Sequence, residues 1–143
     1  MAESPYDSKT AATPVRPLSP HLQIYRLTIT MVMSIVHRIT GVALYVGTLL
    51  LAWWLIALAS GPDAFAFVQG VMSSLVGKLV LLGFTWSLLH HALGGVRHFV
   101  WDTGVSFEPG SREAWAWFTI IGSVLLTVGV WVLACWLNPG VLS

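Results

Sequence analysis

Three long apolar runs dominate the pattern of hydrophobic and polar positions along the chain. They cover residues 39–59, about 67–96 and 114–137. Because about 20 apolar residues suffice to cross the hydrocarbon core of a bilayer, each run is long enough to span it. The pattern therefore predicts an all-α membrane protein with three transmembrane helices.

Short segments with helix-breaking residues separate the runs. In Ser60-Gly61-Pro62-Asp63 the glycine suits the end of a helix, and the proline cannot continue one. Glycines and prolines also mark a loop over 103–112 and a stop at 138–140. We therefore predict a three-helix transmembrane anchor over 28–137, with helices at about 28–59, 64–101 and 112–137. A short outer tail follows over 138–143.

Residues 1–27 precede the first helix and are rich in serine, threonine, proline and alanine. This composition is typical of a flexible tail. Pro17 and Pro20 favour an extended chain over 16–26, and Leu22, Ile24 and Tyr25 could rest at the membrane surface. We therefore predict a flexible, interfacial N-terminal segment.

Basic residues gather on one side of the predicted membrane. None occurs over 60–70 or after residue 137, whereas six lie near the opposite helix ends: Lys9, Arg16, Arg26, Arg38, Arg97 and Arg112. The positive-inside rule therefore places the N-terminus and the 103–112 loop in the cytoplasm. The seventh base, Lys78, lies toward the outer end of the second helix, where we expect it to snorkel to the interface.

The composition narrows the classes of function. With 56% hydrophobic and 9% charged residues, the chain is unlike an ordinary soluble domain. A net charge of +1 gives no basis for nucleic-acid binding. The single cysteine, Cys135, excludes an intrachain disulfide and is interpreted as a small packing residue.

The predicted topology brings the polar groups of the membrane region together in one leaflet. With three spans, the start of the first helix and the end of the second lie at the same depth, on the cytoplasmic side. An ionisable side chain at mid-membrane costs roughly 2.5–3.5 kcal/mol, so a group of them is a functional candidate. The candidates are Ser34, His37, Arg38, His91, Arg97, His98 and Asp102.

The stretch over 90–98 has the groups that a haem requires. His91 and His98 are seven residues apart and share nearly one helix face. Gly94 and Gly95 leave the surface beside His91 without side chains, so a flat macrocycle has room there. Arg97 suits a propionate. Since no Cys-x-x-Cys-His occurs, a haem here is non-covalent.

Some of these residues have simpler interpretations. His90 cannot face the same way as His91, so one of the two points at a partner helix or into a hydrogen bond. We favour His91 as the iron ligand because the glycines and His98 share its surroundings. Arg97 alone could equally mark the cytoplasmic interface, and His98 with Asp102 could be an interfacial pair.

Ser34 and Arg38, on the first helix, suit a second ligand. They are four residues apart and share a face. A hydroxyl and a guanidinium together can hydrogen-bond a carbonyl oxygen, such as that of a quinone. His37 points about 100° away and can face a different neighbour. The simpler alternative for Arg38 is a marker of the interface.

Three motifs resemble one known family, the cytochrome b556 large membrane-anchor subunit of succinate dehydrogenase (succinate:quinone oxidoreductase, complex II). The first motif resembles its mitochondrial and alphaproteobacterial branch in particular. They occur in the family's order and cover about 16–137: Arg16-Pro-Leu-Ser-Pro-His-Leu-Gln-Ile-Tyr25, Ser34-Ile-Val-His-Arg-Ile-Thr-Gly41 and His91-x3-Gly95-x-Arg97-His98-x3-Asp102.

The resemblance implies roles for these residues. His91 matches the axial ligand of haem b, and Ser34 and Arg38 match residues of the quinone site. His37 and His98 match positions near the haem propionates. From their place in the sequence pattern, and not from the resemblance, we add Arg38, Arg97 and Gly95 as candidate haem residues and Asp102 as a candidate for proton delivery.

The resemblance also implies partners and a location. A second, smaller anchor subunit would share the haem and complete a heterodimeric helix bundle. An iron–sulfur subunit and a flavoprotein would dock on the cytoplasmic face of the bacterial inner membrane, with ubiquinone as substrate. The chain has no flavin or iron–sulfur motif, so it cannot oxidise succinate alone.

Two other functions remain alternatives. A proton-coupled transport subunit could use His91, His98 and Asp102 as a relay, which predicts polar groups in both leaflets. The outer half holds little beyond Lys78 and a few hydroxyls. The other alternative is a structural anchor without haem. An optical spectrum separates the three hypotheses, because only the haem-binding subunit would show a reducible b-type spectrum.

Overall fold

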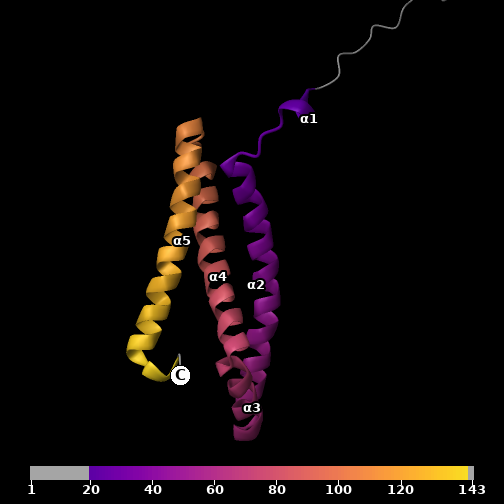
Figure 1. The fold of residues 1–143 in the computed structure, drawn as a ribbon, viewed down its shortest axis with the longest axis vertical. Coiled ribbons are helices and arrows are strands. Elements are labelled where there is room, and N and C mark those ends of the chain that lie inside the picture. Colours follow the sequence, from indigo (N-terminus) through magenta and orange to yellow (C-terminus); the bar gives the residue numbers. More distant parts are fainter. Residues whose placement is uncertain (1–19, 142–143) are drawn as a thin grey trace, which may run out of the picture.

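The computed structural model describes residues 20–141, and every regular element in this range is a helix (Figure 1). The predicted all-α class is confirmed. Three of the helices, α2, α4 and α5, are long and apolar enough to cross a membrane. The elements in chain order are α1 (His21–Ile24), α2 (Ile29–Ser60), α3 (Pro62–Ser73), α4 (Leu75–Asp102), α5 (Pro109–Leu137) and the 3-10 helix η1 (Pro139–Val141).

The three long helices run up and down beside one another. Figure 1 shows α4 between α2 and α5, with α5 diverging from the other two toward its C-terminal end. The start of α2, the end of α4 and the start of α5 lie at one end of the bundle, and α3 lies at the other (Figure 1). The two polar helix ends are therefore neighbours, as the sequence predicts.

The boundary between the first two helices follows the predicted break. Gly61, with φ 119°, separates α2 from α3, and this backbone conformation favours glycine. Pro62 occupies the first turn of α3, where its missing N–H costs nothing. The third long helix begins at Pro109, three residues before the predicted start, for the same reason.

The prediction of one continuous helix over 64–101 is wrong. The structure divides it into α3 and α4 at Ser74, whose backbone is extended with φ −63° and ψ 159°. The Ser74 hydroxyl caps α4 by accepting a hydrogen bond from the Gly77 amide at 3.1 Å. A Cβ at Gly77 would overlap the carbonyls of Val71 and Met72, so glycine permits this tight junction.

The prediction of an extended chain over 16–26 is wrong for its described part. Pro20 is followed by the single-turn helix α1, and the amides of Gln23 and Ile24 donate to the Pro20 carbonyl at 2.9 and 3.0 Å. The fixed φ of proline suits the residue that starts such a turn. The flexible segment predicted over 1–19, with the start of the first motif, lies outside the described residues, as do residues 142–143 of the outer tail.

Small and hydroxyl-bearing residues form the contact between α4 and α5. Thr119 and Ser123 are 0% exposed, and Thr127 is buried on the same face of α5. Their hydroxyls donate to carbonyls of their own helix, at Trp115, Ile120 and Ser123. These side chains therefore need no water, and they allow the close helix approach that membrane bundles use.

A substitution at Gly47 tests the packing of α2 against α4. A Cβ at this position would overlap the ring of Phe84, whereas a Cβ at Gly83 would meet no heavy atom within 4 Å. We expect Gly47→Ala to lower the free energy of unfolding by about 1–3 kcal/mol through overpacking. Gly83→Ala is the matched control and should be neutral or slightly stabilising. Thermal unfolding of the detergent-solubilised protein measures both, and equal losses would contradict the predicted contact.

Candidate functional site

Three imidazoles meet where the start of α2 lies against the end of α4. The rings of His37 and His91 stack with centroids 3.9 Å apart and an interplanar angle of 16°. The His98 ring meets His37 edge-on, with centroids 5.5 Å apart. His91 and His98 therefore share the α2-facing side of α4, as their seven-residue spacing predicts.

The orientation of His91 is fixed by α2. Its Nδ1 lies 3.1 Å from the carbonyl oxygen of His37 and 3.3 Å from Oγ1 of Thr40. Because the carbonyl can only accept, Nδ1 carries the proton and Nε2 keeps its lone pair. Nε2 has no hydrogen-bond partner among residues 20–141. The contribution of Thr40 could not be foreseen, since it depends on the packing of two helices.

His90 faces away from this cluster and is only 1% exposed. Its Nδ1 lies 3.2 Å from Oγ of Ser123 on α5, and its ring lies against Trp86 with centroids 5.1 Å apart. Because the Ser123 hydroxyl donates to the Ile120 carbonyl, it accepts from His90. The other nitrogen, Nε2, is enclosed without a partner in the described part of the chain. A large macrocycle cannot reach that nitrogen in this packing.

The surface without side chains beside His91 is narrower than predicted. The space above Gly94 is filled by the His37 ring, which a Cβ at Gly94 would overlap. Gly41 faces Cε1 of His91, 3.2 Å from where its Cβ would lie. Of these three glycines, Gly95 alone has no heavy atom within 4 Å of its Cβ position. The sequence spacing placed Gly94 and Gly95 beside His91. It could not show that His37 of α2 fills the space over Gly94.

Arg97 is buried within the bundle, at 3% exposure. Its guanidinium carbon lies 5.1 Å from the centre of the Trp101 ring, a cation–π contact. Its Nε and Nη1 atoms are buried without a hydrogen-bond partner in the region 20–141. This burial argues against the simpler interpretation of Arg97 as a marker of an open interface.

The remaining candidates lie on open surface at the same end of the bundle. Ser34 and Arg38 are exposed on α2, and His98 and Asp102 are exposed on α4. Within the described residues His98 and Asp102 form no ion pair with each other. The alternative of an interfacial His98–Asp102 pair therefore finds no support.

The comparisons with known proteins identify the family. Residues 12–138 match the family described as succinate dehydrogenase/fumarate reductase transmembrane subunit. The chain belongs to this family. It is 44% identical over 113 residues to the succinate dehydrogenase cytochrome b556 subunit of Paracoccus denitrificans, over 79% of this chain and 87% of that protein.

More distant relatives carry matching names. The succinate dehydrogenase cytochrome b556 subunit of Rickettsia felis is 37% identical over 117 residues, 82% of this chain and 91% of that protein. The mitochondrial succinate dehydrogenase cytochrome b560 subunit of Sus scrofa is 34% identical over 119 residues, 80% of this chain and 69% of that protein. The resemblance seen in the three motifs is thereby confirmed.

Family membership settles the class of function. The chain is a multi-pass membrane subunit of the cytochrome b type from succinate dehydrogenase, an oxidoreductase. The alternative of a proton-coupled transport subunit finds no support in these relatives.

Proposed function

We propose that His91 is the axial ligand of a non-covalent haem b. The observation that carries the proposal is the hydrogen bond from His91 Nδ1 to the His37 carbonyl, 3.1 Å long, which leaves Nε2 without a partner in the described chain. Histidines that bind metals commonly donate their other ring N–H to a carbonyl, which fixes the tautomer. Haem b supplies one-electron transfer when it is bound.

The neighbouring residues fit the other parts of a haem. Gly95 offers open space one turn along α4 from His91. Arg97 holds a buried positive charge with two unpartnered nitrogen atoms, which is costly unless an anion pairs with it. We assign Arg97 to a propionate, with Arg38, His37 and His98 as further polar neighbours at the same end of the bundle.

A second imidazole would come from another chain. His90 is enclosed between α4 and α5, and Nε2 of His37 is buried against its neighbours. Neither offers a second ligand from this subunit. We therefore propose that a smaller anchor subunit supplies that ligand and completes the helix bundle.

Ser34 and Arg38 would bind the quinone. Both are exposed four residues apart on α2, where a hydroxyl and a guanidinium can reach one carbonyl oxygen. The quinone oxygen gains negative charge on reduction, and Arg38 offers a fixed positive charge beside it. Asp102, exposed at the end of α4, would deliver protons from the adjacent aqueous phase.

The proposed setting is the bacterial inner membrane with the N-terminus in the cytoplasm. The asymmetry of basic residues supports this orientation. The iron–sulfur subunit and flavoprotein would dock at the end of the bundle that carries the histidines, so electrons from succinate would reach ubiquinone there.

Expression with and without the second anchor subunit tests the shared haem site. We expect the chain produced alone to bind little haem, because half of the coordination is missing. Co-production with that subunit should restore a reducible b-type optical spectrum and succinate-dependent quinone reduction. The measurement is haem per protein. A haem-replete chain in the absence of any partner would overturn the shared site.

A further inference from the structure

Thr40 is almost fully buried where α2 meets α4, with 1% of its surface exposed. Its hydroxyl donates a hydrogen bond of 3.0 Å to the His37 carbonyl, within α2. The same hydroxyl oxygen lies 3.3 Å from Nδ1 of His91 on α4, and that Nδ1 lies 3.1 Å from the His37 carbonyl oxygen. The hydroxyl, the carbonyl and the imidazole N–H therefore form a closed triangle of hydrogen bonds between two helices.

The direction of each hydrogen bond in this triangle is determined. The His37 carbonyl can only accept, so it accepts from the Thr40 hydroxyl and from Nδ1 of His91. Because the Thr40 hydroxyl directs its only proton at that carbonyl, its oxygen presents a lone pair to His91. The N–H of His91 is therefore shared between two acceptors, and Thr40 supplies the second of them.

Packing holds His91 against this hydroxyl. A threonine within a helix has two favoured χ1 rotamers, and the bond to the carbonyl three residues before Thr40 selects one of them. Gly41 brings the backbone of α2 close to the imidazole, since a Cβ there would lie 3.2 Å from Cε1 of His91. The His37 ring covers the face of the imidazole, with centroids 3.9 Å apart. The edge and the plane of the His91 ring are therefore both fixed by α2.

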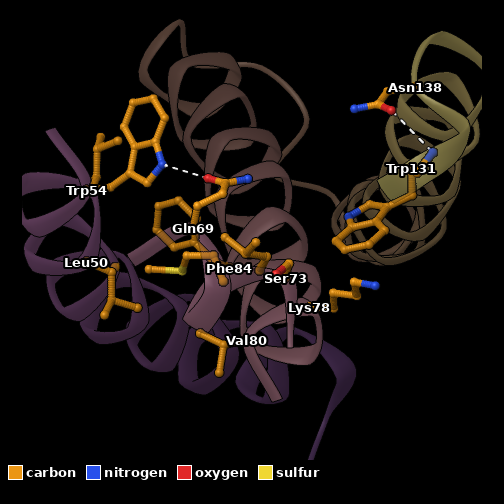
Figure 2. Close-up of a pocket in the computed structure, with 14 residues that line it drawn as sticks. Leu50, Trp54, Gln69, Ser73, Lys78, Val80, Phe84, Trp131 and Asn138 are labelled. Atoms are coloured by element: carbon orange, nitrogen blue, oxygen red, sulfur yellow. Dashed lines mark hydrogen bonds between the residues drawn. The ribbon is translucent and has the colours of Figure 1, made fainter. Parts of the chain in front are cut away.

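The triangle is separate from the cavity at the other end of the bundle. That cavity has a volume of about 510 Å³, and its lining contains Gly47 and Phe84 but none of the three residues of the triangle. Figure 2 shows Phe84 in the cavity wall. The Phe84 ring fills the space beside Gly47, about two turns along α2 from Thr40. This contact lies between the cavity and Thr40, so water in the cavity would not replace a hydroxyl removed from Thr40.

We propose that Thr40 is a positioning residue for His91, and that its hydroxyl lowers the reduction potential of the haem that His91 binds. The proposal rests on His91 as the iron ligand, and it gives a role to the threonine of the second motif. A second acceptor on the N–H makes the imidazole a stronger electron donor to iron. A stronger donor favours ferric over ferrous iron, because the ferric ion carries more positive charge. Hydrogen bonding to the axial ligand is one of the means by which a protein sets the potential of a haem.

A redox titration of the purified complex, followed by the optical spectrum of its haem, tests the proposal. Thr40→Val keeps a branched side chain but removes the hydroxyl. We expect it to raise the midpoint potential, with the preference for ferric iron falling about threefold, equivalent to about 30 mV for one electron. Thr40→Ser retains the hydroxyl and should keep the wild-type potential. Thr48→Val is the matched control, because the exposed Thr48 hydroxyl also bonds a carbonyl of α2, that of Leu44, and should leave the potential unchanged.

The possible outcomes separate a role of the hydroxyl from a role in packing. An unchanged or lowered potential in Thr40→Val would overturn the proposal, and so would equal shifts in Thr40→Val and Thr40→Ser. If Thr40→Val retains no haem, retention by Thr40→Ser supports the hydroxyl, whereas loss of haem from both variants contradicts it. Retention of haem in His91→Ala would instead overturn the ligand assignment, so a failure of this inference and a failure of the proposed function are distinguishable.

Discussion

Replacement of His91 by alanine is expected to abolish the b-type haem spectrum of the purified complex. Nδ1 of His91 donates to the His37 carbonyl of α2, and Nε2 has no partner in the described chain. The substitution therefore removes the proposed iron ligand together with the hydrogen bond that orients it. The optical spectrum of the reduced protein measures the outcome. We expect haem content to fall to a small fraction of that of the wild type, since the neighbouring His90 and His37 have their Nε2 atoms buried within the described chain.

His90→Ala is the matched control because the two histidines are adjacent in sequence. His90 bonds Ser123 on α5 and lies away from the cluster, so its removal should retain a normal low-spin spectrum. It should cost about 1–3 kcal/mol of stability, because a buried hydrogen bond and part of the α4–α5 packing are lost. Haem loss in His90→Ala with haem retention in His91→Ala would overturn the ligand assignment.

Arg38→Leu should lower succinate-dependent quinone reduction on the order of 100-fold, the effect typical of removing one group that stabilises developing charge. Ser34→Ala should lower it less, since a neutral hydrogen bond contributes less than a full charge. The measured quantity is the turnover rate with a soluble ubiquinone analogue. Both residues are exposed, so neither substitution disturbs a packed contact within the described chain.

The reduction of a soluble dye by the hydrophilic subunits is the control for this prediction. It should remain at the wild-type rate in both variants, because those electrons do not pass through the proposed quinone site. Arg112→Leu, another exposed base at the same end of the bundle, should affect neither activity. A parallel fall of dye and quinone reduction in Arg38→Leu would make the residue structural and displace the quinone site from α2.

The hydrophobic pattern was sufficient to predict three membrane-spanning helices and their relative direction. Each apolar run is long enough to cross the hydrocarbon core of a bilayer, so the prediction needed no information on how the helices pack. The break at Ser74 was missed because it lies within an apolar run and uses neither proline nor glycine at the broken position. A serine that caps a helix looks, in sequence, like one inside it.

The difference between His90 and His91 shows where prediction from sequence ends. Periodicity showed that the two imidazoles point in different directions, but it could not show which neighbour each one meets. Ser123 on α5 and the His37 carbonyl on α2 decide that, and both belong to other helices. The same limit applies to Gly94. The sequence predicts open space beside this glycine, but in the fold the His37 ring fills that space.

The length of α2 has a consequence for access from water. Its 32 residues give a helix about 48 Å long, whereas the hydrocarbon core is about 30 Å thick, so about 9 Å extends beyond the core at each end if the helix is centred. Ser34 lies five residues, or about 7.5 Å, from the first residue of the helix. It is therefore level with the surface of the hydrocarbon layer. A quinone headgroup bound at the proposed site would therefore exchange protons with the aqueous phase over a few ångströms, while its apolar tail would stay in the lipid.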